Sequence, residues 1–400
     1  MTGDAPAGAS LEPILASREI VVFCGSGGVG KTTTAAATAL EAAVRVGGRV
    51  LVLTIDPARR LADALGLEGI GNVDRRVPDD VLRAAGIEPR GELYAAMLDT
   101  KASWDDLVLR HAPNEETAYR ILDNHLYATV TGRFVQSHDY IAMERLYDLH
   151  ASGRYDLIVV DTPPTRNAID FLEAPARMAE FFGGRLLRWL TMPYRVGGRR
   201  GARLINFASR PFYQLADRVL GRQFLQDIAE FFLNFQTMYD GFVARAQAVE
   251  ELLHERRTGF VVVTTLEDAP LREAQFFCTE LGTRRFNLDA LVLNRVLPEY
   301  VRGDAAAAAA ARLLEDTDSI VEKLGALDVP DLDDAGQTAR VLRAVAETYN
   351  DYRVVAAREG DLREHLAAAP DIVATVPVLE DDVHDLAGLR LIGTELLPVS

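Results

Sequence analysis

The sequence predicts an α/β protein with a doubly wound, mostly parallel sheet of about seven strands and an inserted helical subdomain. Seven short apolar runs recur along the 400 residues, without the alternation of apolar and polar side chains that marks a half-exposed strand. Helical patterns separate these runs, which is typical of a sheet covered by helices on both faces. The first run passes directly into a glycine-rich loop and then a helix, an arrangement that binds phosphate groups.

Each predicted strand is a continuous apolar run that ends where polar or turn-forming residues follow. The strands cover residues 20–24, 49–55, 93–98, 155–160, 259–265, 288–293 and 371–376. Helices are expected within residues 34–46, 61–65, 101–150, 168–257, 270–284, 304–325, 334–366 and 383–392.

The domain organisation follows from where the α/β pattern is interrupted. Residues 1–17 are expected to be a flexible leader, and residues 68–92 are expected to be a loop because they are polar and contain two prolines. Residues 18–400 are expected to form a single α/β domain, with helical insertions at about 100–150 and 168–257.

Composition narrows the class of protein. With 48% hydrophobic residues the chain can bury a sizeable core, and its net charge of −16 argues against nucleic-acid binding. Two cysteines, Cys24 and Cys278, make neither a disulfide framework nor a C-x-x-C metal site. The N-terminus has no signal-peptide pattern and no uncharged apolar run is long enough to span a membrane, so we expect a cytoplasmic protein.

The glycine-rich loop after the first strand carries the motif G-x-x-x-x-G-K-T, from Gly25 to Thr32. Glycines let the backbone bring its N–H groups close to phosphate oxygens, and the following helix N-terminus adds positive potential. Lys31 would lie along the β- and γ-phosphates of a bound nucleotide, and the Thr32 hydroxyl would bind Mg²⁺. The residues expected to bind the nucleotide here are Gly27, Gly28, Val29, Gly30, Lys31, Thr32 and Thr33.

Three further polar residues end predicted strands, where a parallel sheet places its ligands. Asp56 could orient or deprotonate an attacking water, although an Asp here could also cap the next helix. Asp161 stands where an acid would hold Mg²⁺, and it too could be a helix cap. Asn294 could hydrogen-bond an adenine edge, or simply form a turn.

Together these segments resemble the deviant-Walker ATPases, and most closely the arsenical pump-driving and guided-entry (tail-anchored protein targeting) subgroup. The resemblance is carried by the phosphate loop and by Ile55-Asp56-Pro57-Ala58, Asp161-Thr162-Pro163-Pro164-Thr165, Val292-Leu293-Asn294-Arg295 and Val376-Pro377 with Glu380-Asp381-Asp382-Val383. It spans nearly the whole chain.

The resemblance implies an ATPase that binds ATP and Mg²⁺ in a dimer that opens and closes with nucleotide state. It makes Asp56 and Lys31 the catalytic residues, with water activation by Asp56, and it assigns magnesium and γ-phosphate sensing to Asp161 and adenine contact to Asn294. It assigns the metal to Thr32, Asp56 and Asp161, and nucleotide contact to Asn294 and Pro377. A Min- or Par-like ATPase on membrane or DNA, or a scaffold subunit with little hydrolysis of its own, are the alternatives.

Ser26 stands where the family usually has a second lysine, which reaches the nucleotide of the partner subunit. We therefore expect either a homodimer or a heterodimer with a related subunit that keeps this lysine. The missing C-x-x-C predicts no zinc at the dimer interface, and the absence of a cysteine cluster makes a metalloid-pump role doubtful.

Residues 171–222 contain ten arginines and three acids, a local net charge of +7, together with many aromatic and aliphatic side chains. Such a surface would suit an apolar client helix or a membrane-associated partner. The same pattern also fits helices packed on the ATPase core with arginines on the solvent side.

Overall fold

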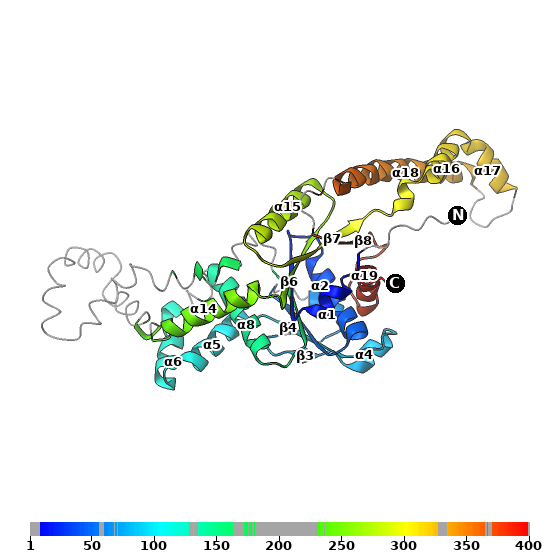
Figure 1. Cartoon of the computed structure of the whole chain (residues 1–400). Helices are drawn as coiled ribbons and strands as arrows, with labels where there is room; N and C mark the ends of the chain where they lie inside the picture. The colour runs from blue at the N-terminus through cyan, green and yellow to red at the C-terminus, as the bar shows by residue number, and fades with distance from the viewer. Residues whose placement is uncertain are drawn as a thin grey trace, which may run out of the picture.

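In the computed structural model one sheet organises the chain (Figure 1). The structure describes residues 9–55, 60–67, 69, 71–127, 131, 135–162, 172–174, 176–177, 180, 231, 233–235, 237–326, 334–364, 366 and 370–398. Among these residues the eight strands are β1 (Ile20–Cys24), β2 (Arg49–Thr54), β3 (Arg75–Arg76), β4 (Glu92–Met97), β5 (Leu157–Asp161), β6 (Thr258–Thr264), β7 (Leu288–Val296) and β8 (Ile372–Pro377).

The strand order is β3-β4-β2-β5-β1-β6-β7-β8, and each pair is parallel except β3 with β4. The predicted doubly wound, mostly parallel α/β fold is confirmed, and so are all seven predicted strands. In the sheet β1 lies between β5 and β6. The strands β2 to β5 that follow it in the chain lie on one side of β1, and β6, β7 and β8 lie on the other side. The loop after β1 therefore lies at a switch point of the sheet, where such folds bind ligands.

The predicted loop at 68–92 was wrong in part. It contains β3 and helix α4 (Asp79–Ala84), whose Leu82 is buried. Both elements are too short to show a period in the sequence. Residues 9–17, expected to lie in a flexible leader, also differ: α1 (Glu12–Ser17) buries Ile14 and Leu15, and the Leu11 N–H donates to Leu396 O at 3.0 Å.

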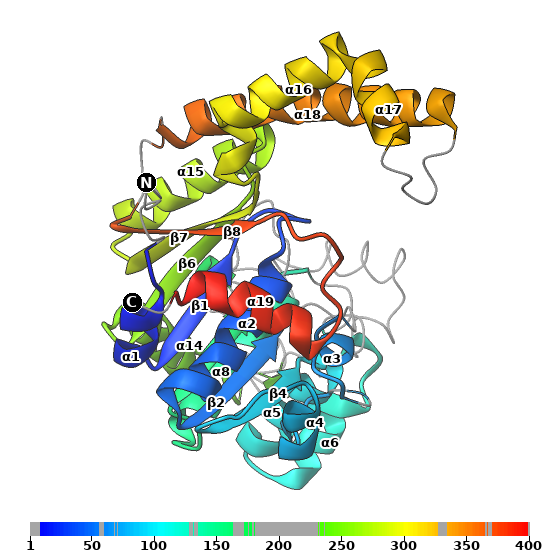
Figure 2. The same cartoon turned by 90° about the vertical axis from the view of Figure 1, so that its right-hand side faces the viewer.

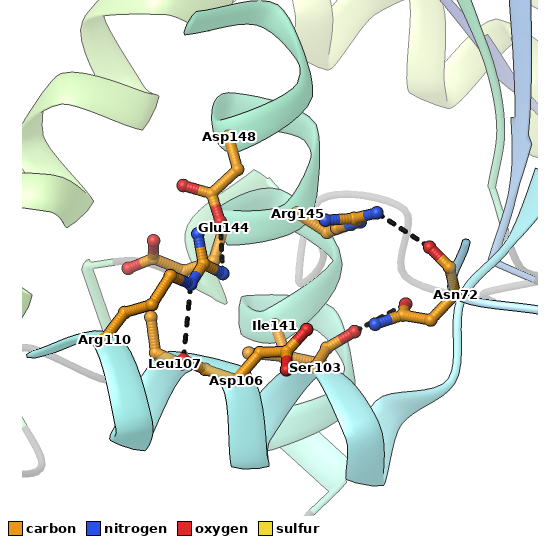
Figure 3. A pocket seen from close by; sticks show the side chains of 9 residues that line it. All are labelled: Asn72, Ser103, Asp106, Leu107, Arg110, Ile141, Glu144, Arg145 and Asp148. Atoms are coloured by element: carbon orange, nitrogen blue, oxygen red, sulfur yellow. Dashed lines mark hydrogen bonds and ion pairs between the residues drawn. The ribbon is translucent and has the colours of Figure 1, made fainter. Parts of the chain in front are cut away.

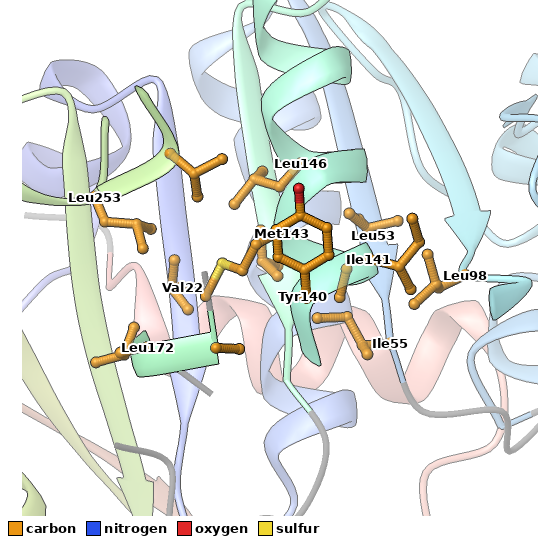
Figure 4. Packing of buried hydrophobic residues seen from close by; sticks show 14 of the residues in the cluster. Val22, Leu53, Ile55, Leu98, Tyr140, Ile141, Met143, Leu146, Leu172 and Leu253 are labelled. Atoms are coloured by element: carbon orange, nitrogen blue, oxygen red, sulfur yellow. The ribbon is translucent and has the colours of Figure 1, made fainter. Parts of the chain in front are cut away.

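Helices cover both faces of the sheet (Figure 2). On one face the buried cluster joins inward side chains of the strands to α5 (Thr100–His111), α6 (Glu115–Leu122), α8 (Val135–Ala151), α14 (Tyr239–His254) and α15 (Asp268–Thr283). Figure 4 shows Tyr140 and Met143 of α8 packed among Val22, Leu53 and other aliphatic side chains of this cluster. Strand residues that point the opposite way, such as Val21 and Val52, pack in the second cluster.

The second face is covered by elements that carry the candidate site. They are α1, α2 (Lys31–Glu41) with its π-helical continuation η1 (Ala42–Val46), α3 (Arg60–Ala64), α4 and α19 (Leu386–Leu396). The buried Glu41 of α2 accepts from Arg45 at 2.6 Å and pairs with Arg390 of α19 at 2.8 Å. This ion-pair cluster joins the helix after the glycine loop to the last helix of the chain.

Between β7 and β8 the chain leaves the two layers and forms a helical arm (Figures 1 and 2). The arm contains η2 (Glu299–Arg302), α16 (Asp304–Glu315), α17 (Thr317–Gly325) and the long α18 (Ala335–Glu364). The sequence predicted helix over 304–325 and 334–366, where α16, α17 and α18 are found, but it predicted neither η2 nor the position of these helices outside the sheet's covering layers. Among the described residues, no helix combines the length and the apolar character needed to cross a bilayer.

Candidate functional site

The glycine loop connects the buried end of β1 to the first turn of α2, and its backbone needs glycine at several positions. Gly25, Gly28 and Gly30 have φ of 148°, 82° and 90°, values that side chains with a Cβ rarely adopt. A Cβ on Gly25 would lie 2.2 Å from the carbonyl oxygen of Val263 in β6. The loop is thus held tightly against the neighbouring strand, with its open side toward solvent at Gly27 and Gly28.

Lys31 is buried to 6% exposure and curls back over its own loop, donating from Nζ to the Ser26 carbonyl oxygen at 2.8 Å. Thr32 and Thr33 follow in the first turn of α2 and are partly exposed, whereas Thr34 is buried and donates to Gly30 O at 2.9 Å. The glycine loop and the first turn of α2 therefore carry an amine, a hydroxyl and a helix N-terminus in consecutive residues, which is the chemistry that holds phosphate.

The structure brings Asp161 to the same edge of the sheet. It ends β5, pairs in register with Phe23 of β1 and Thr54 of β2, and is fully buried. The Thr54 hydroxyl donates to Asp161 Oδ2 at 2.9 Å, and the next residue, Thr162, donates from Oγ1 to Phe23 O at 2.8 Å. These bonds fix the carboxylate between the ends of β1 and β2.

Asp56 lies outside the described residues, and so do Pro163, Pro164 and Thr165 of the quoted Asp161–Thr165 motif. The chain just before Asp56 is described: Ile55 donates its N–H to Asp161 O at 3.0 Å. Of residues 171–222, the described part is 172–174, 176–177 and 180, so most of the predicted client surface also lies outside.

Asn294, near the end of β7, touches the glycine loop directly. Its Nδ2 donates to Val29 O at 2.8 Å, its Oδ1 accepts from the Arg295 N–H at 3.0 Å, and it is 5% exposed. A Cβ on Gly30 would lie 2.2 Å from the same Nδ2. The Asn294 side-chain amide, which was expected to contact the adenine base, therefore also stabilises the phosphate loop, and the sequence did not predict this role.

A cleft of about 580 Å³ opens beside these residues. Its walls come from the first turns of α2, from α3, from the ends of β7 and β8 and from the segment that leads to α19. The lining residues are Gly30, Thr32, Thr33, Ala36, Leu61, Asp63, Ala64, Asn294, Arg295, Val376, Pro377, Val378, Leu379, Asp381, Asp382, Val383, His384 and Ile392. The volume suits a cofactor-sized ligand.

Several of these residues were missed from the sequence. Arg295 belongs to a motif quoted from the sequence, but no role was assigned to it. Asp63, His384 and Ile392 reach the cleft because α3 and α19 pack beside the glycine loop, which the sequence does not show. The predicted residues Gly30, Thr32, Thr33, Asn294 and Pro377 all line the cleft. Their roles toward a ligand stay predictions.

A second cavity lies between α5 and α8, away from the glycine loop (Figure 3). It measures about 10 Å³, room for one water, and is lined by charged and amide groups. Arg145 donates to Asn72 O at 2.7 Å across it, and Arg110 pairs with Asp148 at 2.7 Å. Its size excludes a nucleotide.

Both cysteine thiols are buried, an environment that disfavours the reactive thiolate. Burial raises the pKa of the Cys24 thiol to about 12 and that of Cys278 to about 11, so both stay protonated. Among the described residues, no group of three or more His, Cys, Asp or Glu side chains is arranged to hold a metal ion. Asp56, one of the predicted metal ligands, is outside that set.

Comparison with known proteins shows the family of the chain. Residues 18–330 match the family model described as Anion-transporting ATPase. The chain is 27% identical over 304 residues to the putative arsenical pump-driving ATPase 1 of Aquifex aeolicus, covering 70% of this chain and 64% of that protein. It is 32% identical over 295 residues to the uncharacterized protein SCO2128 of Streptomyces coelicolor, covering 71% and 64%.

A eukaryotic relative, the ATPase ASNA1 homolog 1 of Paramecium tetraurelia, is 25% identical over 281 residues, covering 68% of this chain and 73% of that protein. The first two relatives are thus matched over slightly less than two thirds of their own length. The family model covers the glycine loop, β5 with Asp161, and β7 with Asn294. The family resemblance inferred from the motifs is therefore confirmed, and the chain belongs to the anion-transporting ATPase family.

Proposed function

We propose that the chain binds ATP with Mg²⁺ in the cleft beside the glycine loop and hydrolyses it, and that nucleotide state controls a helical partner surface. The observation that carries this proposal is the meeting of three groups at one edge of the sheet: the glycine loop with Lys31, the buried Asp161, and Asn294 braced against Val29. Family membership supports the hydrolysis of ATP.

The donor set fits a magnesium ion, because it consists of oxygen atoms. Thr32 contributes a partly exposed hydroxyl, and Asp161 contributes a carboxylate that Thr54 already orients. With Asp56 as a further acid, these residues would hold Mg²⁺, which neutralises phosphate charge when bound.

Each residue then has a defined task in the hydrolysis. Lys31 exchanges its bond to Ser26 O for the phosphates, and the loop amides hold the same oxygens. Asp56 takes a proton from, or orients, the water that attacks the γ-phosphate. Asn294 and Pro377 bound the part of the cleft that would receive the base.

The test is calorimetric titration of the purified protein with Mg-ATP, followed by phosphate release. Lys31→Ala should weaken binding by about 10- to 100-fold, since a hydrogen bond to a charged group contributes about 1.5–3 kcal/mol. Lys323→Ala is the matched control, because Lys323 is an exposed lysine of α17. Asp56→Asn should release phosphate much more slowly even at saturating Mg-ATP, because it removes the carboxylate that orients or deprotonates the attacking water. Wild-type protein that takes up no Mg-ATP would refute the proposal.

The dimer is a separate part of the proposal. Ser26 occupies the position of the family's trans-acting lysine, and its Oγ is buried without a hydrogen-bond partner among the described residues. A cation supplied from a partner can raise turnover by about 10³–10⁵. We infer that the chain pairs with a related subunit that carries this lysine. Purification of the native complex tests this: a strictly homodimeric particle with full ATPase activity would contradict it.

A further inference from the structure

The end of β7 carries a bulge, between Leu293 and Val296, that contains Asn294 and Arg295. In the pairing of β7 with β8, Leu293 is opposite Thr375 and Val296 is opposite Pro377, so three steps on β7 match two on β8. A bulge of this kind turns the strand and re-aims a side chain, often next to a functional site. Here it lets Asn294 stay buried against the glycine loop while Arg295 is exposed.

Arg295 has φ of 58°, in the left-handed region where glycine or asparagine is normally found. Its N–H donates to Asn294 Oδ1 at 3.0 Å, and the Val378 N–H donates to Val296 O at 3.0 Å on the other side of the bulge. The surrounding bonds therefore impose a conformation that an arginine adopts at a cost. Such strain persists at ligand sites, where the side chain is needed in that place.

The chemistry around Arg295 points to a base rather than to phosphate. Among the described residues that line the cleft, Arg295 is the one arginine or lysine, and no described residue forms a hydrogen bond or ion pair with its guanidinium group. The strand beside it, β8, brings Val376 and Pro377 to the cleft, which is also lined by Leu379, Asp381 and Asp382. Carboxylates and apolar walls disfavour a triphosphate, whereas a planar, uncharged ring fits between apolar side chains and a planar cation.

We propose that Arg295 is a base-binding residue whose guanidinium group lies against the ring of the bound nucleotide, held there by the strained bulge. This deepens the proposed function and rests on nucleotide binding in this cleft. The phosphates remain the task of the glycine loop and Lys31, so Arg295 should affect affinity through the base alone.

The chain offers a matched control. Arg285 is also an exposed arginine with positive φ, 64°, but it precedes β7 and lies at the opposite end of the strand. Glycine at either position removes the same kind of backbone strain and the same charge. Both Arg285→Gly and Arg295→Gly should therefore raise the melting temperature of the nucleotide-free protein.

The two variants should differ in binding. Arg295→Gly should raise the Kd for Mg-ATP about three- to tenfold, the range for loss of a cation–π contact, while Arg285→Gly leaves it unchanged. The Kd for magnesium tripolyphosphate, which has no base, should be unchanged in both. Arg295→Lys should recover little, because an ammonium group cannot stack as a plane.

Three results bear against the inference. Equal Mg-ATP affinity in Arg295→Gly and wild type would overturn it. An equal loss of affinity for Mg-ATP and for tripolyphosphate would also overturn it, because it would make Arg295 a phosphate ligand. Wild-type protein that binds no Mg-ATP would refute the proposed function itself and this inference with it. The melting temperatures establish in each case that the variant is folded.

Discussion

The contact between Gly30 and Asn294 makes a sharp test of how the sheet edge holds the phosphate loop. We consider Gly30→Ala in nucleotide-free protein. The new methyl group has two costs: φ at this position is +90°, and the added Cβ would lie 2.2 Å from Asn294 Nδ2. The first cost is about 1–2 kcal/mol for an L-residue in a left-handed conformation.

The second cost comes from the hydrogen bond that the methyl group displaces. Asn294 Nδ2 donates to Val29 O at 2.8 Å in a buried setting, and leaving such partners unsatisfied costs about 1–3 kcal/mol. Gly30→Ala should therefore lower the free energy of unfolding by about 2–5 kcal/mol. Asn294→Ala alone should lower it by about 1–3 kcal/mol, because it removes the same hydrogen bond.

Urea denaturation of the single and double variants measures the coupling. In the Asn294→Ala background, Gly30→Ala should cost about the backbone share alone, so the coupling energy should be about 1–3 kcal/mol. Gly28→Ala is the control, since Gly28 has φ of 82° but a Cβ there meets nothing within 4 Å. The reasoning fails if Gly30→Ala costs no more than Gly28→Ala, or if its cost is the same with and without the Asn294 amide.

Three further predictions concern buried polar groups. Thr54→Val removes the hydroxyl that donates to the fully buried Asp161, so it should lower the free energy of unfolding by about 1–3 kcal/mol and slow phosphate release. The control is Thr279→Val, at an exposed threonine on α15, and equal stability of the two variants would contradict a stabilising role of the Thr54–Asp161 hydrogen bond. Arg390→Ala leaves the buried Glu41 with Arg45 as its one ion-pair partner, and it should lower the free energy of unfolding in urea by about 1–3 kcal/mol. Arg343→Ala removes an exposed pair 3.4 Å long and should change the same free energy by less than about 1 kcal/mol. The reverse order would contradict the stabilising role of the ion pairs between α2 and α19. Burial raises the pKa of Glu144 on α8 by more than its pairing with Arg245 at 3.1 Å lowers it, so the folded state favours the protonated acid. The resulting stabilisation should be complete below the unfolded-state pKa of about 4.5. It should be lost as pH rises through the raised folded-state pKa. Stability measured against pH should therefore fall in the wild type relative to Glu144→Gln over that window, and parallel curves would refute the assignment.

The amino-acid sequence by itself determined the class of fold and the phosphate loop. Continuous apolar runs can be buried only in a sheet covered on both faces, and the glycine loop with Lys31 carries its chemistry in consecutive residues. Local information is sufficient in both cases. Local information was not sufficient for β3 and α4, because they are too short to show a hydrophobic periodicity. It was also not sufficient for α1, because Leu11 and Ile14 are buried only through packing with distant elements such as α19.

Only the tertiary structure decided how distant strand ends share one site. Asp161 is a solitary acid in the sequence, and it becomes a fixed carboxylate because β2 brings Thr54 to within 2.9 Å of it. Asn294 lies 265 residues from Val29, yet it supplies the bond that braces the phosphate loop. Strand order and register place such pairs side by side, and neither is written in the spacing of residues along the chain.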